Sequence, residues 1–473
     1  MLEGLEVIEL NSKDVYGSLY GRFDAEFFNK KYIENEKSLD FKKSVFLSEL
    51  AVITDGEHGS PDLDDESGII YLSGNNVKDN QIDFGNVRYC TEKLHVKNAR
   101  SSVKKNTVLM SIVGTVGKAS VVHDDVIANT DRNVATIKPN TLINPHYLSI
   151  FLNCKFGTNQ TDRFSTGNVQ PLLNLSQLKQ IKICNFGMGF QSAIAELSQA
   201  QDEKLKQSKV SYTQAEQILL EEVGLADFTP SKQNTNIKTF AQSFGASGRL
   251  DAEYYQPKYD AYIQQIKNYK HGFKSIAEVL TIPIKNGTTP SSVTPGYNAS
   301  EHYFVRVEAF QENLTIDETL FNSLDKEDYQ KYKANLTIKN DILVSMTGTI
   351  GAVVIYSPEK PALINQNIMR LRCNESIINT ESLSIYLKTI GKVLLERVQT
   401  GNVQPYVNTS NFEILIVPLI DLKTQTHISE LVQQSFTLKA QSEHLLSVAK
   451  RAVEMAIEQD EAAAMHFIEN STN

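Results

Sequence analysis

The sequence predicts an α+β protein in which two tandem α/β domains, the products of an internal duplication, are separated by two long helices of coiled-coil-like character. Two observations carry this prediction. The hexapeptide TGNVQP occurs at residues 166–171 and again at 400–405, an offset of 234 residues. A long gap-free stretch of helical character follows each copy, over residues 191–224 and 425–458. A repeat on this scale indicates a duplicated structural unit.

The same offset aligns the chain on both sides of the hexapeptide. LMSIVGTVGKASVV (109–122) aligns with LVSMTGTIGAVVIY (343–356) without a gap. Nearer the N-terminus, GRFDAEFFNKKY (21–32) matches GRLDAEYYQPKY (248–259) at an offset of 227. The second copy therefore carries seven extra residues between the GRLDAEYY segment and the glycine turn. Insertions of this kind are expected in surface loops.

Each copy is expected to begin with a short helical segment, because RFDAEFF and RLDAEYY place acidic residues before aromatic residues that are spaced for one helical face. Strands are expected next, for example within 68–74 and 302–310. The runs 106–114 and 340–348 are apolar and β-branched, end at a glycine turn and resume as KASVV and AVVIY. They predict a strand, a turn and a second strand.

A short element after TGNVQP is expected to start near Ser176 in the first copy and Ser410 in the second, since serine is a common helix N-cap. A β-branched strand, IKI or ILIV, follows in each copy. Each copy then closes with its long helical stretch.

The long stretches carry heptad patterns typical of paired helices. In the second stretch Ile428, Ser435, Ser442, Ala449 and Ala456 recur every seven residues, and Leu431, Leu438, Leu445 and Ala452 fall three further on. The first stretch keeps Ile194, Leu197, Ala215 and Ile218 but is more polar between them. Small and apolar residues at such positions predict that the two helices pack side by side.

The composition is that of a soluble globular protein, with 41% apolar and 22% charged residues among 473. The sequence has no run of about 18 apolar residues and no basic-then-apolar start, so a cytoplasmic location is expected. The cysteines are Cys90, Cys154, Cys184 and Cys373. Because they lie far apart, they predict reduced and mostly buried thiols.

The net charge of −9 argues mildly against nucleic-acid binding, because neutralising phosphates supplies most non-specific affinity. The charge is unevenly distributed, however. Residues 93–105 and 331–339 are basic, whereas 62–67, 318–328 and 458–461 are acidic. The total charge therefore does not settle the partner.

Enzymatic motifs are missing from the sequence. The nine histidines are scattered, none pairs at metal-ligand spacing, and HExxH, GxSxG and GxGxxG do not occur. GTVGKAS (114–120) is not a P-loop, since two residues separate its glycines where four are needed, and Ala352 replaces Lys118 in the second copy. We therefore expect no metal, no cofactor and no catalysis by this chain alone.

The amides of TGNVQP have two readings. Asn168, Gln170, Asn402 and Gln404 can hydrogen-bond a base edge or a neighbouring backbone. Identical residues in both copies are poor candidates for discrimination between two targets. Structural or backbone-contact roles are therefore favoured.

Two divergent copies, each with a GRLDAEYY-like entry, a GTIG hairpin, a TGNVQ loop before an IxI(V)P strand and a closing helix, resemble the DNA specificity subunit of type I restriction-modification systems. The resemblance covers about residues 20 to 460. It implies two target recognition domains that each read one half of a bipartite DNA sequence. It also implies that the two long helices form an antiparallel coiled-coil-like spacer, which sets the distance between the halves and docks two methyltransferase subunits, with restriction or translocase subunits as further partners. Catalysis is then expected in those partners.

Two alternatives stay open at this point. Similar specificity subunits occur in other methylation-based phage-defence systems. A two-module scaffold that binds proteins or glycans would also suit the acidic charge and the long helices.

The resemblance gives the following division of the chain. It comprises an N-terminal conserved segment (1–43), target recognition domain 1 (44–186), spacer helix 1 (187–225), a linker (226–248), a conserved segment (249–272), target recognition domain 2 (273–419), spacer helix 2 (420–462) and a flexible tail (463–473). A helix of 34 residues is about 50 Å long, more than one turn of B-DNA. Because the copies have diverged, the predicted target has two unlike halves.

The divergent loops, 54–64 and 285–294, are where discrimination is expected. The candidate DNA-binding residues are Lys104, Lys105, Lys118, Arg132, Asn168, Gln170, Lys285, Asn286, Arg306, Lys331, Lys333, Gln366, Asn402 and Gln404. The candidate structural turns are at Gly114, Gly117, Gly167, Gly348, Gly351 and Gly401.

Overall fold

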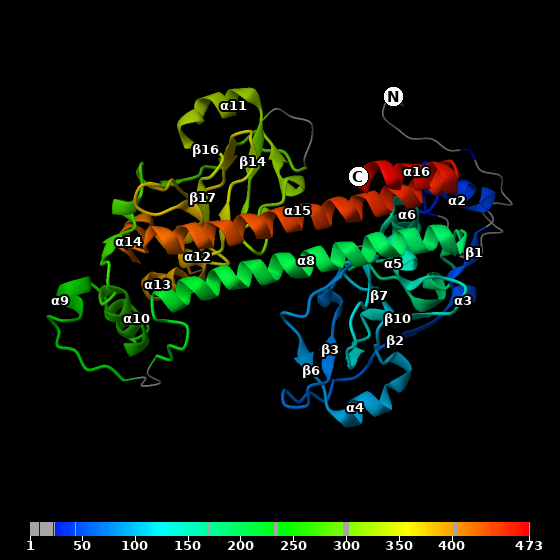
Figure 1. Ribbon diagram of the computed structural model, residues 1–473, viewed down its shortest axis with the longest axis horizontal. Coiled ribbons are helices and arrows are strands. Elements are labelled where there is room, and N and C mark those ends of the chain that lie inside the picture. The colour runs from blue at the N-terminus through cyan, green and yellow to red at the C-terminus, as the bar shows by residue number, and fades with distance from the viewer. Residues whose placement is uncertain are drawn as a thin grey trace. The chain divides into compact units, whose positions relative to one another are not determined.

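The computed structural model describes residues 9, 22, 24–42, 44–167, 170–230, 235–296, 302–401 and 405–472. The chain divides into two compact units. The first unit is Met1–Leu205 with Lys439–Asn473, and the second unit is Lys206–Leu438. Each unit therefore holds one copy of the duplicated domain and one part of each long helix (Figure 1).

A four-stranded antiparallel sheet in the order β2-β10-β7-β8 forms the centre of the first unit. Its strands are β2 (Ala51–Asp55), β10 (Val134–Pro139), β7 (Val108–Ser111) and β8 (Ala119–Val121). A second sheet has the order β6-β3-β9, from β6 (Arg88–Tyr89), β3 (Ile70–Leu72) and β9 (Ala128–Thr130), in which β3 and β9 are parallel. The two-stranded pairs are β4 (Val77–Lys78) with β5 (Gln81–Ile82) and β1 (Val45–Phe46) with β11 (Lys182–Ile183). The helices of this copy are α2 (Lys30–Phe41), α3 (Leu47–Leu50), α4 (Glu92–Lys97), α5 (Pro145–Asn153), α6 (Lys155–Phe164) and α7 (Leu175–Leu178).

The second unit repeats this plan. Its central sheet has the order β13-β20-β17-β18, from β13 (Lys285–Asn286), β20 (Ile368–Leu371), β17 (Ile342–Ser345) and β18 (Val353–Ile355). The second sheet has the order β15-β14-β19-β16, from β15 (Asn322–Ser323), β14 (Tyr303–Val305), β19 (Ala362–Ile364) and β16 (Leu336–Thr337). The pair β12 (Phe273–Ser275) and β21 (Ile416–Pro418) corresponds to β1 and β11. The helices of this copy are α9 (Phe244–Ser247), α10 (Pro257–Lys267), α11 (Lys326–Lys331), α12 (Thr380–Tyr386), α13 (Lys392–Val398) and α14 (Thr409–Glu413), with a π-helical turn, Leu387–Gly391, between α12 and α13.

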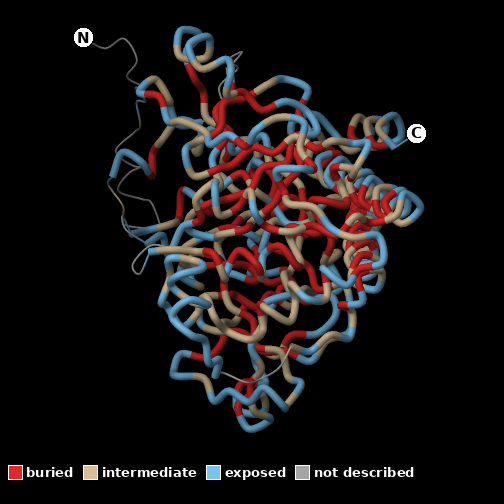
Figure 2. Tube along the Cα trace, turned by 90° about the vertical axis from the view of Figure 1, so that its left-hand side faces the viewer, coloured by how far each residue is buried: buried red, intermediate tan, exposed pale blue. Residues whose placement is uncertain are grey.

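The central strands are apolar along their whole length because both of their faces are covered. In β7, Val108 and Met110 point into the core that α5 completes, while Leu109 points into a separate core with Leu72 of β3. Strand side chains alternate between faces, so each run of apolar residues serves two cores. The buried residues, red in Figure 2, accordingly run through the interior of the trace.

Two long helices, α8 (Met188–Glu222) and α15 (Leu422–Glu458), pack side by side and antiparallel (Figure 1). In the second unit Ser208 Oγ lies 3.0 Å from Ser435 Oγ, and Glu222, further along α8, meets Thr424, earlier on α15. In the first unit Gln201 Nε2 donates to Ser442 Oγ at 3.1 Å. The polar heptad residues are therefore buried and paired with one another. The predicted side-by-side helix pair is confirmed.

Several sequence predictions about local structure are wrong. RFDAEFF and RLDAEYY precede helices and do not form them: α2 starts at Lys30 after the N-cap Asn29, and α10 starts with Pro257. Asn174 and Asn408, not Ser176 and Ser410, cap α7 and α14, because their side chains accept from Gln177 N and Asn411 N.

The flexible tail predicted over 463–473 is likewise wrong for residues 463–472. These residues lie in the helix α16 (Glu461–Thr472). Ala464 and Ile468 of α16 are buried in the core of the first unit. This burial holds the segment in place.

All four cysteines are free and buried, as predicted. Burial raises the pKa of the Cys154, Cys184 and Cys373 thiols to about 12, so these groups stay protonated near neutral pH. Within the described ranges, no helix has the length and apolar character needed to cross a membrane.

Candidate nucleic-acid interface

One end of the central sheet of the first unit gathers the loops that differ between the copies. β10 runs antiparallel to β2 and β7, and its first residues face the last residues of both neighbours: Ala135 faces Asp55 and Val134 faces Ser111. The loop after β2, the glycine turn after β7 and the turn before β10 therefore emerge together. We call this the loop end of the first unit, made of residues 56–64, 112–118, 131–133, 166, 167 and 170–172.

The TGNVQP hexapeptide is fastened to the glycine turn at this loop end. Thr166 and Leu172 exchange backbone hydrogen bonds of 2.9 and 2.8 Å, and Gly114 N donates to Pro171 O at 2.9 Å. Gln170 is exposed, whereas the predicted contact residue Asn168 lies outside the described residues. The loop therefore rests on the frame of the domain through its two ends.

The second copy of the hexapeptide is held in the same way. Thr400 and Tyr406 exchange backbone bonds of 2.9 and 2.8 Å, and Val407 N donates to Met346 O at 3.1 Å as Leu173 N donates to Ile112 O at 2.9 Å in the first copy. The predicted residues Asn402 and Gln404 are beyond the part of the chain that the structure describes. The described ends of this loop (400, 401, 405 and 406) and the glycine turn 348–351 form the corresponding loop end of the second unit, together with 287–296 and 365–367.

The six glycines proposed for turns all have positive φ. The values are +78° and +93° at Gly114 and Gly117, +70° and +75° at Gly348 and Gly351, and +96° and +94° at Gly167 and Gly401. L-residues with a side chain rarely adopt this conformation. At Gly117 a Cβ atom would in addition lie 2.7 Å from Thr161 Oγ1.

The divergent loop 54–64 is fixed to the domain by Glu57. This carboxylate is buried and accepts hydrogen bonds from Asn98 Nδ2 at 2.6 Å, Gly59 N at 2.9 Å and Lys97 Nζ at 3.2 Å. The bonds from Asn98, Gly59 and Lys97 lower the pKa of Glu57 from 4.5 to about 2. Glu57 is therefore ionised at neutral pH, and its carboxylate holds the loop against Asn98 and Lys97 through hydrogen bonds.

A hollow of about 480 Å³ lies at the loop end of the first unit. Among the residues that line it are Glu57, His58, Arg88, Asp131 and Arg132. The guanidinium of Arg88 also stacks over the Tyr71 ring, 5.3 Å from its centroid. Two exposed guanidinium groups therefore face an open and mainly polar space.

The structure brings some candidate residues of the first unit together and separates others. Lys118, Arg132 and Gln170 lie at the loop end and are exposed. Lys104 and Lys105 precede β7 and so lie at its opposite end, although they are close to the glycine turn in sequence. A contact surface centred on the loop end thus excludes these two lysines.

In the second unit, Lys285 and Asn286 form β13 at the start of the divergent loop 285–294, and both are exposed. Thr409 Oγ1 donates to Asn286 Oδ1 at 3.0 Å. Arg306 follows β14, whose residue Val305 accepts a hydrogen bond from Asn365 N at 3.0 Å, and this places Arg306 next to the turn that carries Gln366.

The two remaining lysines precede β16. Lys333 lies three residues before β16. Because β16 is antiparallel to β19, the start of β16 lies beside the end of β19, which leads into the turn 365–367. Lys331 is the last residue of α11. Four candidates, Lys285, Asn286, Arg306 and Gln366, thus share one end of the second unit, with Lys333 beside them.

Arg88, Lys97 and Arg100 lie beside the loop end of the first unit, and the sequence prediction missed them. Arg100 makes an ion pair with Asp55 at 3.5 Å, and Lys97 makes one with Glu57. Lys97 and Arg100 belong to the basic stretch 93–105, which was visible in the sequence. The strand pairing that separates the first half of this stretch from Lys104 and Lys105 was not visible in the sequence.

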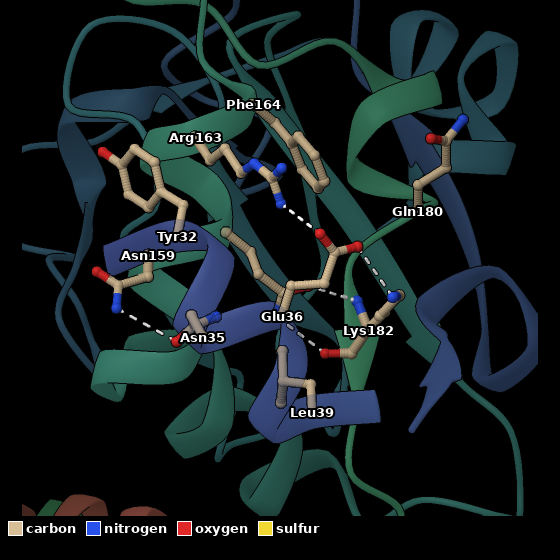
Figure 3. A pocket seen from close by; sticks show the side chains of 10 residues that line it. Tyr32, Asn35, Glu36, Leu39, Asn159, Arg163, Phe164, Gln180 and Lys182 are labelled. Atoms are coloured by element: carbon tan, nitrogen blue, oxygen red, sulfur yellow. Dashed lines mark hydrogen bonds and ion pairs between the residues drawn. The ribbon is translucent and has the colours of Figure 1, made fainter. Parts of the chain in front are cut away.

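In both units, an arginine in the segment before the sheets binds the backbone just ahead of the TGNVQP loop. Arg22 bonds Asp24 and donates to Ser165 O at 3.1 Å, and Arg249 bonds Asp251 and donates to Gln399 O at 3.0 Å. Figure 3 shows the neighbouring site in the first unit, where Glu36 of α2 lies between Arg163 and Lys182, at 2.8 and 3.0 Å. Burial acts to raise the pKa of Glu36, but the hydrogen bonds from Arg163 and Lys182 outweigh it and lower that pKa. These polar groups are paired internally.

Comparison with known proteins points to one family. A family model described as the type I restriction modification DNA specificity domain matches residues 40–185 and 268–446. The specificity subunit of the type I restriction enzyme EcoBI from Escherichia coli is 30% identical over 120 residues, which are 25% of this chain and 25% of that protein. The chain thus aligns with about a quarter of the length of this curated relative.

Solved structures of the same description align over most of the chain. The S subunit of a type-I restriction-modification system from M. genitalium is 14% identical and covers 88% of this chain and 94% of its own, with a TM-score of 0.43. The HsdS subunit from Thermoanaerobacter tengcongensis is 14% identical and covers 88% and 96%, with a TM-score of 0.29.

Proposed function

Because the chain belongs to the family defined by the type I restriction-modification DNA specificity domain, we propose that it reads an asymmetric bipartite DNA target, one half with each unit. The observation that carries the proposal is the pair of loop ends. The two are held by equivalent backbone bonds at an offset of 234 residues, yet they present different side chains. A common frame with unlike loops suits a protein that binds two different sequences in the same manner.

The chain serves as a specificity subunit and leaves the chemistry to partners. Two methyltransferase subunits modify the DNA that it selects, and restriction subunits join through them. The pseudo-symmetric α8–α15 pair supports two such docking sites, because residues 234 positions apart have the same environment. For example, the contact of Gln201 with Ser442 is repeated by that of Ser435 with Ser208. The family membership favours this function over that of a scaffold for proteins or glycans.

Candidate DNA contacts follow from the loop ends. In the first unit they are Lys118, Arg132 and Gln170, and in the second they are Lys285, Asn286, Arg306, Lys333 and Gln366. Because the net charge is −9, much of the affinity for phosphate has to come from the partner subunits.

Co-expression with the cognate methyltransferase tests this function. The two proteins should purify together, and the host DNA should carry methylated adenine at a single bipartite sequence only when both are present. A complex that forms but methylates without any sequence preference would contradict the proposal.

A further inference from the structure

Two turns, 131–133 and 365–367, occupy the same place in the two units. Asn133 N donates to Asp131 Oδ1 at 2.9 Å, and Asn367 N donates to Asn365 Oδ1 at 3.1 Å. Both are Asx turns, in which a side-chain oxygen of the first residue fixes the backbone two residues on. The residue at the tip is Arg132 in one unit and Gln366 in the other.

The backbone bonds that hold the two ends of each turn are equivalent in the two units. Asp131 N and Asn365 N each donate to the preceding parallel strand, to Leu72 O at 2.9 Å and to Val305 O at 3.0 Å. On the other side, Ile112 N and Met346 N donate to Asn133 O and Asn367 O at 2.9 and 2.8 Å. Each tip is thus held by strands of both sheets of its unit and presented in the same way.

The tip side chains are exposed and unengaged. Within the described part of the chain, neither the Arg132 guanidinium nor the Gln366 carboxamide makes a hydrogen bond or ion pair with another residue. A polar side chain that is held on a rigid tip and left without an internal partner is available for a ligand.

At a second pair of equivalent positions, an arginine in the first unit is again replaced by a carboxamide residue in the second. Arg88 faces Tyr71 in the pairing of β6 with β3, and Asn322, 234 residues later, faces Phe304 in the pairing of β15 with β14. The first unit therefore presents two guanidinium groups where the second presents two carboxamides. Asn322 is partly engaged, because its Oδ1 accepts from Gly296 N at 3.2 Å. Gln366 is therefore the principal contact candidate of the second unit.

We propose that Arg132 reads a guanine in one half of the target and Gln366 reads an adenine in the other half, an inference that rests on the function proposed above. In the major groove guanine offers two acceptors, O6 and N7, which match the paired donors of arginine. Adenine offers the N7 acceptor and the N6 donor, which match the two ends of a glutamine amide. Arg88 supports the guanine contact from within the same hollow.

The test uses the complete complex of this chain with its methyltransferase and a DNA library in which both half-sites are randomised. Methylated molecules are sequenced for the wild type and for the variants Arg132→Ala, Arg132→Gln and Gln366→Ala. Arg132→Ala should lose the preference for guanine at one position of one half by about tenfold to a hundredfold. Arg132→Gln should shift that position towards adenine, and Gln366→Ala should relax an adenine position in the other half only.

The controls remove a cation elsewhere in the same units. Lys93→Gln on α4 and Lys339→Gln before β17 both change exposed lysines and should leave every base preference unchanged.

A uniform loss of methylation across all sequences, with a shallower salt dependence, would assign Arg132 to a phosphate and overturn the inference. Unchanged preferences at every position would overturn it as well. If the wild-type complex itself had no bipartite target, the proposed function would fail first, and this outcome is distinguishable from the other two.

Discussion

Backbone conformation at single glycines fixes the frame from which the loops emerge. Gly114 and Gly117 both have positive φ, but only Gly117 also lies against another side chain, that of Thr161. An alanine at either position is strained by about 1–2 kcal/mol. At Gly117 the contact with Thr161 adds to this strain.

We therefore expect Gly117→Ala to lower the free energy of unfolding by at least about 1 kcal/mol more than Gly114→Ala does. Chemical denaturation of the two variants beside the wild type measures the difference. Equal losses would mean that Thr161 moves aside without cost.

A buried carboxylate makes the stability of the first unit depend on pH. The folded-state pKa of Glu57 is about 2, below its ordinary value of 4.5, because Asn98, Gly59 and Lys97 donate to the ionised form. A depressed pKa of this kind contributes stability that is fully present above about pH 4.5 and is lost as the pH falls towards 2.

Glu57→Gln should therefore be less stable than the wild type at pH 7, and the difference should shrink on acidification through this window. Unfolding curves for both proteins at several pH values test the prediction. A difference that stays constant down to pH 2 would assign the acid sensitivity to other carboxylates.

At the scale of elements, α16 shows how a short helix is held by few contacts. Ile468 is 8% exposed and packs in the core of the first unit, and Glu461 at the start of α16 accepts a hydrogen bond from Gly187 N at 3.2 Å.

Ile468→Ala should cost about 2 kcal/mol, since a large buried aliphatic side chain is replaced by a small one. Leu422→Ala is the matched control, because Leu422 is 77% exposed and should change stability by less than about 0.5 kcal/mol. Thermal unfolding measures both, and an unchanged midpoint for Ile468→Ala would show that α16 does not contribute to the core.

Elements with a strong periodicity were predictable from the sequence. The runs that became β7 with β8 and β17 with β18 were predicted because apolar and β-branched residues stop at a glycine turn. The long helices were predicted from their heptads. α16 was not, because its apolar residues, such as Ala464 and Ile468, are few and only their burial shows that they form a face.

The candidate interface was predictable only in part. The divergent loops and the tips Arg132 and Gln366 could be found by comparing the two copies at one offset. The grouping of these residues depends on strand order and direction, and a single sequence does not contain that information. For this reason Lys104 and Lys105 seemed close to the glycine turn although β7 separates them from it, and Arg88 was overlooked.

At the scale of the whole molecule, the duplication makes equivalent helix contacts recur in both units. Gln201 bonds Ser442, and Ser208 bonds Ser435, so the paired residue numbers have a constant sum in both units. The boundaries between the two units follow Leu205 in α8 and Leu438 in α15.

This relation predicts the effect of lengthening the helices. Inserting the same seven-residue heptad after Leu205 in α8 and after Leu438 in α15 keeps the pairing register, because both partners shift together. The variant should methylate a target with the same two halves and a longer gap between them. Mapping the methylated sites tests this prediction, and an unchanged gap would show that α8 and α15 do not set the spacing.

The central claim is that each unit reads its own half of the target. Replacing the target recognition domain of one unit tests this claim most directly. Residues 44–186 are exchanged for the corresponding segment of a relative with a different target, the chimera is expressed with the methyltransferase, and modified bases are located by single-molecule sequencing. We expect a new sequence in one half and the original sequence in the other. A target unchanged in both halves would contradict the account.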